Sequence, residues 1–267
     1  MKKSAFAAVA IFALLGLGSA AQAGAPGPAP VQTARNPGDK PAMLDPDNLA
    51  KPRPKAPFDV TGVWQLDNAR SENGFRDRPS NQPTPATQKM LDEAKEFAAK
   101  NLPYNDDTGQ CWPTGLPRIM TRVWPIQMIQ LPTGITMVFA FMNEARWIYT
   151  DGREHGDPDL LTSTWNGETV GKWEGNALVA TTFSFQGKHH WMDEAIPVGE
   201  NARLTERITM PDPNLIQIDQ TWTDPDHWVG EYKNKKVYRR QWGVDVVENH
   251  CLPDTNSHIA AARDAVK

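Results

Sequence analysis

The stretch from residue 144 to residue 176 gathers side chains of the types that build small-molecule sites. Rigid apolar walls can come from its three tryptophans, Trp147, Trp165 and Trp173. The few polar contacts that orient a ligand can come from its charged and hydroxylated side chains, which are Arg146, Tyr149, Asp151, Arg153 and His155. Because tryptophan also fills protein cores, packing is the alternative for each of the three rings. Several rings beside paired charges favour a ligand site.

A further carboxylate lies in an alternating segment. In the predicted strand 202–210, Glu206 shares a face with Leu204 and Ile208, whereas Arg207 lies on the opposite face. We therefore expect Glu206 to point toward the apolar side. A buried carboxylate must find a cation or hydrogen bonds, or take up a proton, so Glu206 is either a structural anchor or a general acid with a raised pKa.

The side chains of the 144–176 stretch suit acid/base chemistry that needs no cofactor. Arg153 or Arg146 would hold a substrate carboxylate through two hydrogen bonds. Tyr149, together with Asp151 or His155, would move a proton on a phenol or an alcohol. We expect Tyr149, Arg153, His155 and Glu206 to converge on one cavity walled by Trp165 and Trp173.

With Glu206 as the donor of a proton to carbon, this set would run a decarboxylation, an elimination or an isomerisation of a small aromatic or hydrophobic carboxylic acid. The alternative is a non-catalytic carrier of small aromatic or hydrophobic ligands. Catalysis predicts polar groups that converge deep in a cavity. A carrier predicts an apolar floor with charges at the rim only.

Signatures of other chemistries are missing. The chain has no Gly-x-Ser-x-Gly elbow, no Gly-x-Gly-x-x-Gly turn and no Gly-x-x-x-x-Gly-Lys loop. His189 and His190 are adjacent, so on a strand they would point to opposite faces, and no HExxH or CxxC pattern accompanies them. We expect neither a metal nor a cofactor.

The elements that must position these residues are mainly strands. One amphipathic helix is predicted over about residues 85–101, after Thr84 as a cap and Pro85 at the first position. Strands are predicted over residues 123–131, 135–142, 146–150, 169–174, 177–185, 202–210, 215–223 and 231–242. Such a run of antiparallel strands favours a meander closed into a barrel, with an open curved sheet as the alternative.

The start of the first strand adds a resemblance. Gly62-Val63-Trp64 is similar to the Gly-x-Trp opening of lipocalin-type barrels, in which the tryptophan closes one end of the cup. Together with the strand count, this resemblance implies a lipocalin-like barrel.

The first 23 residues have the form of a secretory signal peptide. Lys2 and Lys3 precede a short apolar run, and small residues lead to a cleavage site after Ala23. Because the run is too short to span a membrane, we expect a periplasmic or secreted protein that does not insert into a membrane. Removing the two lysines takes the formal charge from −4 to about −6, which argues against nucleic acid as a partner. The oligomeric state stays open.

Composition divides the rest of the chain. Residues 24–57 are rich in Pro, Ala and Gly and predict a flexible leader. A single barrel domain is expected over 58–253, followed by a tail over 254–267.

Cys111 and Cys251 are the only cysteines. In an exported chain such a pair predicts a disulfide rather than two free thiols. A nucleophilic cysteine is the alternative, but neither residue lies in a local pattern that would lower a thiol pKa.

Ordered motifs run through the chain from Cys111 onward. They are CWPTGLPR at 111–118, RWIYTDGREH at 146–155, TWNG at 164–167, VGKWEGNALV at 170–179 and TER at 205–207. As a set they resemble a family of exported, mostly uncharacterised bacterial proteins. The chain departs from that family at Val198-Gly199, where His-Ser is expected. The resemblance implies the cysteine pairing and the barrel, and no particular reaction.

Overall fold

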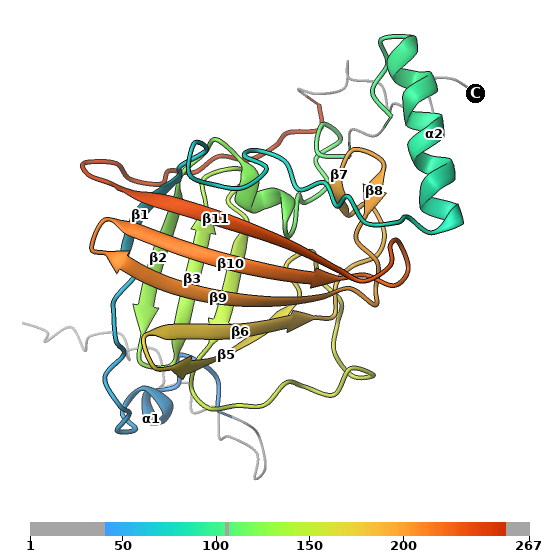
Figure 1. Ribbon diagram of the computed structural model, residues 1–267. Coiled ribbons are helices and arrows are strands. Elements are labelled where there is room, and N and C mark those ends of the chain that lie inside the picture. Colours follow the sequence, from blue (N-terminus) through green and yellow to red (C-terminus); the bar gives the residue numbers. More distant parts are fainter. Residues whose placement is uncertain (1–40, 105–106, 255–267) are drawn as a thin grey trace, which may run out of the picture. The chain divides into compact units, whose positions relative to one another are not determined.

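The structure is a computed structural model that describes residues 41–104 and 107–254. The predicted signal peptide, the leader up to residue 40 and the tail beyond residue 254 lie outside the described residues. The described residues from Pro41 onward belong to one compact unit. Within the described residues, nine strands close into a barrel (Figure 1). The predicted mainly β fold with a closed barrel is confirmed, and the open sheet is not what forms.

The barrel strands are β1 (Gly62–Leu66), β2 (Ile126–Leu131), β3 (Gly134–Phe139), β4 (Ala145–Tyr149), β5 (Glu168–Glu174), β6 (Ala177–Phe183), β9 (Arg203–Asp212), β10 (Leu215–Thr223) and β11 (Glu231–Gln241). Their order around the barrel is β1-β11-β10-β9-β6-β5-β4-β3-β2, and β2 pairs back to β1. All eight predicted strands are present. Their ends differ most at residues 123–125 and 140–142, which lie outside β2 and β3.

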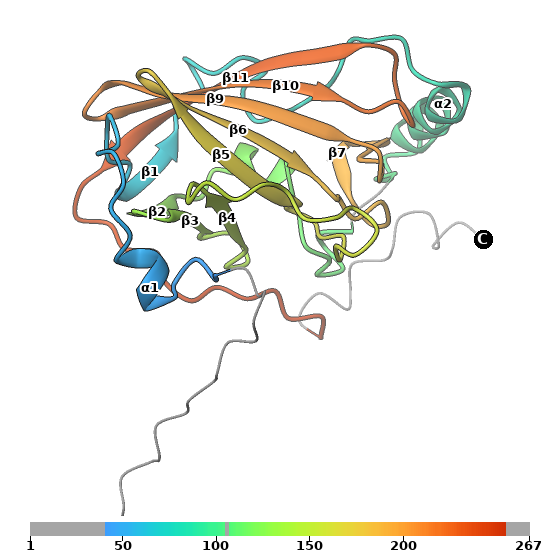
Figure 2. The same cartoon turned by 90° about the horizontal axis from the view of Figure 1, so that it is seen from below.

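The remaining elements stand at the ends of the barrel. The hairpin of β7 (Trp191–Asp193) and β8 (Ile196–Pro197) lies beside helix α2 (Pro85–Ala99), at the opposite end from α1 (Pro46–Leu49) (Figures 1 and 2). The 3-10 helix η1 (Arg118–Thr121) precedes β2. In α2, Thr84 accepts a hydrogen bond from the Thr87 amide, as predicted for a cap. No helix in the described part of the chain is long and apolar enough to cross a membrane.

One strand pair departs from the predicted antiparallel meander. β4 and β5 run parallel, with only Ile148 opposite Thr169 and Tyr149 opposite Val170. The chain leaves β4 and returns through the long connection 150–167, which brings β5 back to the end where β4 began. The seam between these two strands is therefore short, and its two sides need other contacts to hold them.

Trp64 is fully buried among the core side chains of the barrel. Its indole N–H donates to the Val60 carbonyl at 2.8 Å, and the Arg240 guanidinium lies 4.2 Å from the ring centroid. The ring therefore has apolar neighbours, a satisfied N–H and a cation over its face.

Residues 41–57 are not the flexible segment that we expected. Met43 is buried, and its sulfur lies close to Gly134 at the start of β3. Asn48 in α1 donates to Asp151 Oδ2 at 2.8 Å and accepts from Arg53. These few specific contacts hold the segment against the barrel, although its composition is that of a linker.

The predicted disulfide is confirmed. Cys111 and Cys251 are bonded, with their Cα atoms 5.4 Å apart and a separation of 140 positions in sequence. The bond ties the loop before η1 to the segment that follows β11.

We expect free-thiol titration of the unfolded, unreduced protein to find close to no thiol. Because the bridge closes a long loop, reduction should lower the free energy of unfolding by an amount of up to roughly 5 kcal/mol. Urea denaturation with and without reductant measures the loss. Two titratable thiols before reduction would contradict the pairing.

Trp64→Ala should lower the free energy of unfolding by about 3 to 5 kcal/mol, because it removes a large, fully buried ring. Trp242, with 77% of its surface exposed, provides the control, since Trp242→Ala should change stability little. Similar unfolding midpoints for the two variants would show that Trp64 is not a core residue.

Candidate functional site

A buried ion pair lies inside the barrel. Glu206 on β9 and Arg146 on β4 both point inward and expose 0% and 1% of their side chains. Arg146 donates to both carboxylate oxygens of Glu206, at 3.2 Å to Oε1 and through a shorter bond to Oε2. Gln220 on β10 donates to Glu206 Oε1 at 3.1 Å. The inward direction predicted for Glu206 is confirmed.

Arg146 also holds the short seam between β4 and β5 from within. Its second guanidinium nitrogen donates to Thr169 Oγ1 at 3.3 Å and to Thr182 Oγ1 at 3.2 Å. The two hydroxyl groups lie 2.9 Å apart. Strand β4 therefore turns its arginine face to the interior, and its aromatic face lies outside.

The 3-10 helix η1 covers this ion pair. The Met120 sulfur lies 3.9 Å from Arg146 Nη1 and 3.6 Å from Gln220 Nε2. Tyr238 donates its hydroxyl hydrogen to the Met120 carbonyl at 2.6 Å. Glu206 is thus neutralised by a cation, bonded to an amide and covered by a side chain. This geometry fits a structural anchor better than a general acid.

A second buried ion pair was not predicted. Lys236 on β11 is fully buried with its Nζ 3.1 Å from Asp77 Oδ1, which also accepts from Tyr232 and Asn234. Burial raises the pKa of Asp77 to about 6 and lowers that of Lys236, while their mutual attraction opposes both shifts. Alternation along β11 places Lys236 between Tyr232 and Tyr238 on the inward face, and this signal was available in the sequence.

Three residues of the predicted catalytic set, Tyr149, Asp151 and Arg153, lie together on the outer side of the barrel instead. The Arg153 guanidinium lies 4.1 Å from the centroid of the Tyr149 ring and donates to Asp151 Oδ2 at 2.6 Å. Burial opposes ionisation of Asp151, but hydrogen bonds from Arg153 and Asn48 outweigh it and lower the pKa of Asp151 to about 2. Arg153 is therefore already paired with a carboxylate of its own loop, that of Asp151.

His155 follows in the same loop and contacts strands β5 and β6 from outside. Its Nδ1 lies 3.0 Å from Glu168 Oε2, and its Nε2 lies 2.8 Å from Thr181 Oγ1. The predicted convergence of Tyr149, Arg153 and His155 on Glu206 is thus wrong, because residues on opposite faces of the barrel wall cannot meet in one cavity.

The three predicted wall tryptophans do not line one cavity either. Trp147 points outward from β4 and is 48% exposed. Trp165 lies before β5, where its indole N–H donates to the His189 carbonyl at 3.4 Å and its ring lies 6.3 Å from that of Trp112. Trp173 packs edge-on against Phe58 at 5.0 Å. Strand alternation and their separate positions along the chain explain why the three tryptophans lie apart.

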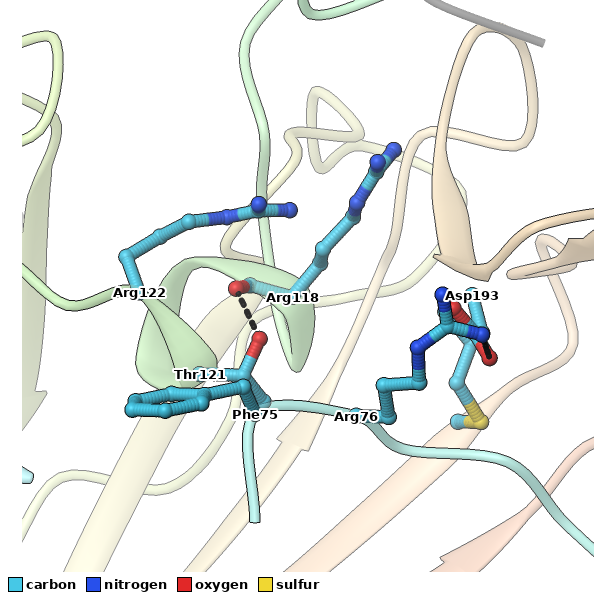
Figure 3. Close-up of a pocket in the computed structure, with 7 residues that line it drawn as sticks. Phe75, Arg76, Arg118, Thr121, Arg122 and Asp193 are labelled. Carbon is cyan, nitrogen blue, oxygen red and sulfur yellow. Dashed lines mark hydrogen bonds and ion pairs between the residues drawn. The ribbon is translucent and has the colours of Figure 1, made fainter. Parts of the chain in front are cut away.

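A cleft of about 120 Å³ lies beside η1 (Figure 3). Its lining consists of Phe75, Arg76, Arg118, Thr121, Arg122, Met192 and Asp193. Arg118 and Arg122 extend from η1 to the same side, and the Arg76 guanidinium lies next to Asp193 (Figure 3). We call this feature the arginine cleft. Sequence reasoning missed it, because its residues come from three distant segments.

The described lining of the arginine cleft is rich in guanidinium groups. Three arginines line it together with one carboxylate, that of Asp193. Asp193 already accepts from Arg78, which lies outside the lining, at 2.9 Å and lies 3.8 Å from Arg76. The lip that carries Phe75 and Arg76 is tied to the barrel, since Lys236 donates to the Gly74 carbonyl at 3.2 Å. The cleft therefore holds its guanidinium groups beside an anchored backbone.

Comparisons with known proteins add little to this site. No protein family model and no curated protein sequence matches the chain, so the motif resemblance remains a prediction. Among solved structures, wild-type fluorescent protein UnaG is 13% identical over 68% of this chain and 97% of its own, with a TM-score of 0.32. An SAHS protein from Ramazzottius varieornatus is 11% identical over 70% and 98%, with a TM-score of 0.35. A mutant of the REP1-NXSQ fatty acid transporter is 13% identical over 68% and 98%, with a TM-score of 0.31.

If Glu206 is an anchor, Glu206→Gln should lower the free energy of unfolding by about 3 to 5 kcal/mol, because it leaves the Arg146 charge buried without a counter-ion. The double variant Arg146→Met/Glu206→Leu should recover most of this loss. Urea denaturation followed by tryptophan fluorescence measures both values.

Glu154→Gln is the matched control, since Glu154 and its partner Lys172 are 78% and 61% exposed and the change should have no measurable effect. A Glu206→Gln protein as stable as its parent would contradict the anchor and return the general acid to consideration.

Proposed function

We propose that the protein is exported and binds a small organic acid, a carboxylate on an aromatic or apolar body, in the arginine cleft. The observation that supports this proposal most directly is the meeting of three guanidinium side chains, those of Arg76, Arg118 and Arg122, in one cleft. Guanidinium groups bind carboxylates through two parallel charge-assisted hydrogen bonds.

The size and the other lining side chains narrow the ligand class. Phe75, 44% exposed, is the aromatic side chain at the cleft, whereas Met192 is buried and the open surface of the cleft is mostly polar. A cleft of about 120 Å³ is well below the roughly 300 to 1,000 Å³ of sites for drug-sized molecules. A single ring or a short chain fits this size.

Binding without turnover agrees best with the neighbouring groups. Glu206 was the expected proton donor for decarboxylation, elimination or isomerisation. It lies beneath η1, where Arg146 and Gln220 donate hydrogen bonds to its carboxylate. Met120, on η1, covers that ion pair. Arg118, on the same turn, and Arg122, directly after it, line the cleft instead. The acid would be held at the rim, as a carrier requires.

Isothermal titration of the mature protein with benzoate tests this proposal. We expect binding that weakens as ionic strength rises and that falls at least about tenfold for neutral benzamide, because each lost charged hydrogen bond costs about 1.5 to 3 kcal/mol. Arg118→Gln/Arg122→Gln should weaken benzoate binding at least as much. Arg207→Gln, at an exposed arginine on the outer face of β9, should leave binding unchanged.

Equal affinity for benzoate and benzamide, or an equal loss in the Arg207 control, would contradict the proposal. Melting temperatures of all variants show whether a loss comes from unfolding. Mass spectrometry of the benzoate and 4-hydroxycinnamate solutions after incubation tests turnover. A product formed in proportion to enzyme would overturn binding without chemistry.

A further inference from the structure

On the outer wall of the barrel, a hydroxyl, an imidazole and a carboxylate are linked in a row by hydrogen bonds. His155 Nε2 lies 2.8 Å from Thr181 Oγ1, and His155 Nδ1 lies 3.0 Å from Glu168 Oε2. Because a carboxylate accepts, Nδ1 of the neutral imidazole carries the hydrogen, and Nε2 is left to accept the threonine hydroxyl hydrogen. We propose that Thr181, His155 and Glu168 form a catalytic site for acyl transfer from small carboxylic esters.

The fold brings these side chains together from three elements. Glu168 is on β5, and Thr181 is on β6 opposite Val170, so the two side chains are diagonal neighbours on the outer face. A diagonal pair is too far apart for direct contact by short side chains. His155, from the connection 150–167, lies between them and bonds to both.

The orientation of the imidazole is fixed from two sides. The Gly156 amide donates to Glu168 Oε2 at 3.1 Å and to Oε1 at 3.3 Å, which holds the carboxylate that holds the ring. Phe183 on β6 packs edge-on against the ring, with the centroids 4.6 Å apart. A base held in this way loses little freedom when it accepts a proton.

A substrate can reach the hydroxyl from solvent. Thr181 is exposed, and the His155 side chain is 26% exposed. The guanidinium of Arg203 lies over the Phe183 ring at 5.3 Å and would be a positive charge near the developing oxyanion. Because Thr181 lies exposed on a strand face and carries a methyl group beside its hydroxyl, small unhindered acyl groups are the matching substrates.

The chemistry balances without any further reactant except water. Thr181 Oγ1 attacks the ester carbonyl carbon while its proton moves to His155 Nε2, and the leaving alkoxide takes that proton as it departs. Water then gives a proton to Nε2 and attacks the acyl-threonine. The proton returns to Thr181 Oγ1, and the carboxylic acid leaves. The net reaction is ester plus water to acid plus alcohol.

The test uses 4-nitrophenyl acetate and the full mature chain. We expect release of nitrophenolate, with about one acetyl group per chain found on the peptide that contains Thr181. Thr181→Val and His155→Gln should each lower the rate by about a hundredfold or more. Thr205→Val, at the neighbouring exposed threonine in register on β9, and His189→Gln, at an exposed histidine, should leave the rate unchanged.

A rate in Thr181→Val equal to that of the parent would overturn the proposal, since His155 would then act alone. An acetyl group confined to lysines would overturn it equally. If His155 serves only to pin the loop, His155→Gln lowers the melting temperature and no acetyl-threonine forms in the parent protein, which also rejects the site. The outcome is independent of benzoate binding at the arginine cleft.

Discussion

Arg146 and Glu206 meet inside the barrel on strands that are not neighbours, and the demands of that buried pair constrain much of the structure around it. Two charges taken out of water are tolerated only when they are paired and their other hydrogen-bonding atoms find partners. The hydroxyl groups of Thr169 and Thr182 and the amide of Gln220 supply most of those partners, while Arg146 Nε has none among the described residues. The same bonds hold β4 to the strands across its short parallel seam.

The direction of Arg146 then decides what lies outside. Since side chains alternate on a strand, an inward Arg146 sends Trp147 and Tyr149 to the outer face. The loop that follows β4 places His155 against the outer wall. Inside, η1 covers the ion pair with Met120 and carries two arginines on its other side, Arg118 and Arg122. One short helical turn thus lies between the buried ion pair and the arginine cleft, and this cleft is where we propose that the ligand binds.

Much of the fold follows from local signals in the sequence. Thr84-Pro85 and helical spacing predicted α2, and alternation predicted eight strands and the inward direction of Glu206. The cysteine count, together with the predicted signal peptide, predicted the disulfide. Alternation along β4 defined two faces but not which of them is inside, because an arginine face and an aromatic face are both plausible linings. Only the position of Glu206 across the barrel decides between them.

The features that sequence reasoning missed depend on contacts between distant segments. The parallel pairing of β4 and β5 follows from the path of the connection 150–167, which lacks a regular pattern. Residues 41–57 have the composition of a linker, yet Met43 and Asn48 fix them to the barrel. The arginine cleft joins residues from positions 75–76, 118–122 and 192–193, and no local pattern indicates that they meet.

The central claim is that small acids bind at the arginine cleft while the barrel interior stays closed by its own charges. Methionine methyl groups report on both places, since Met192 lines the cleft and Met128 and Met137 lie in the barrel core. In a benzoate titration of methyl-labelled protein followed by NMR, we expect the Met192 signal to shift and those of Met128 and Met137 to stay in place. Shifts of Met128 and Met137 with an unmoved Met192 would contradict the account and place the ligand inside the barrel.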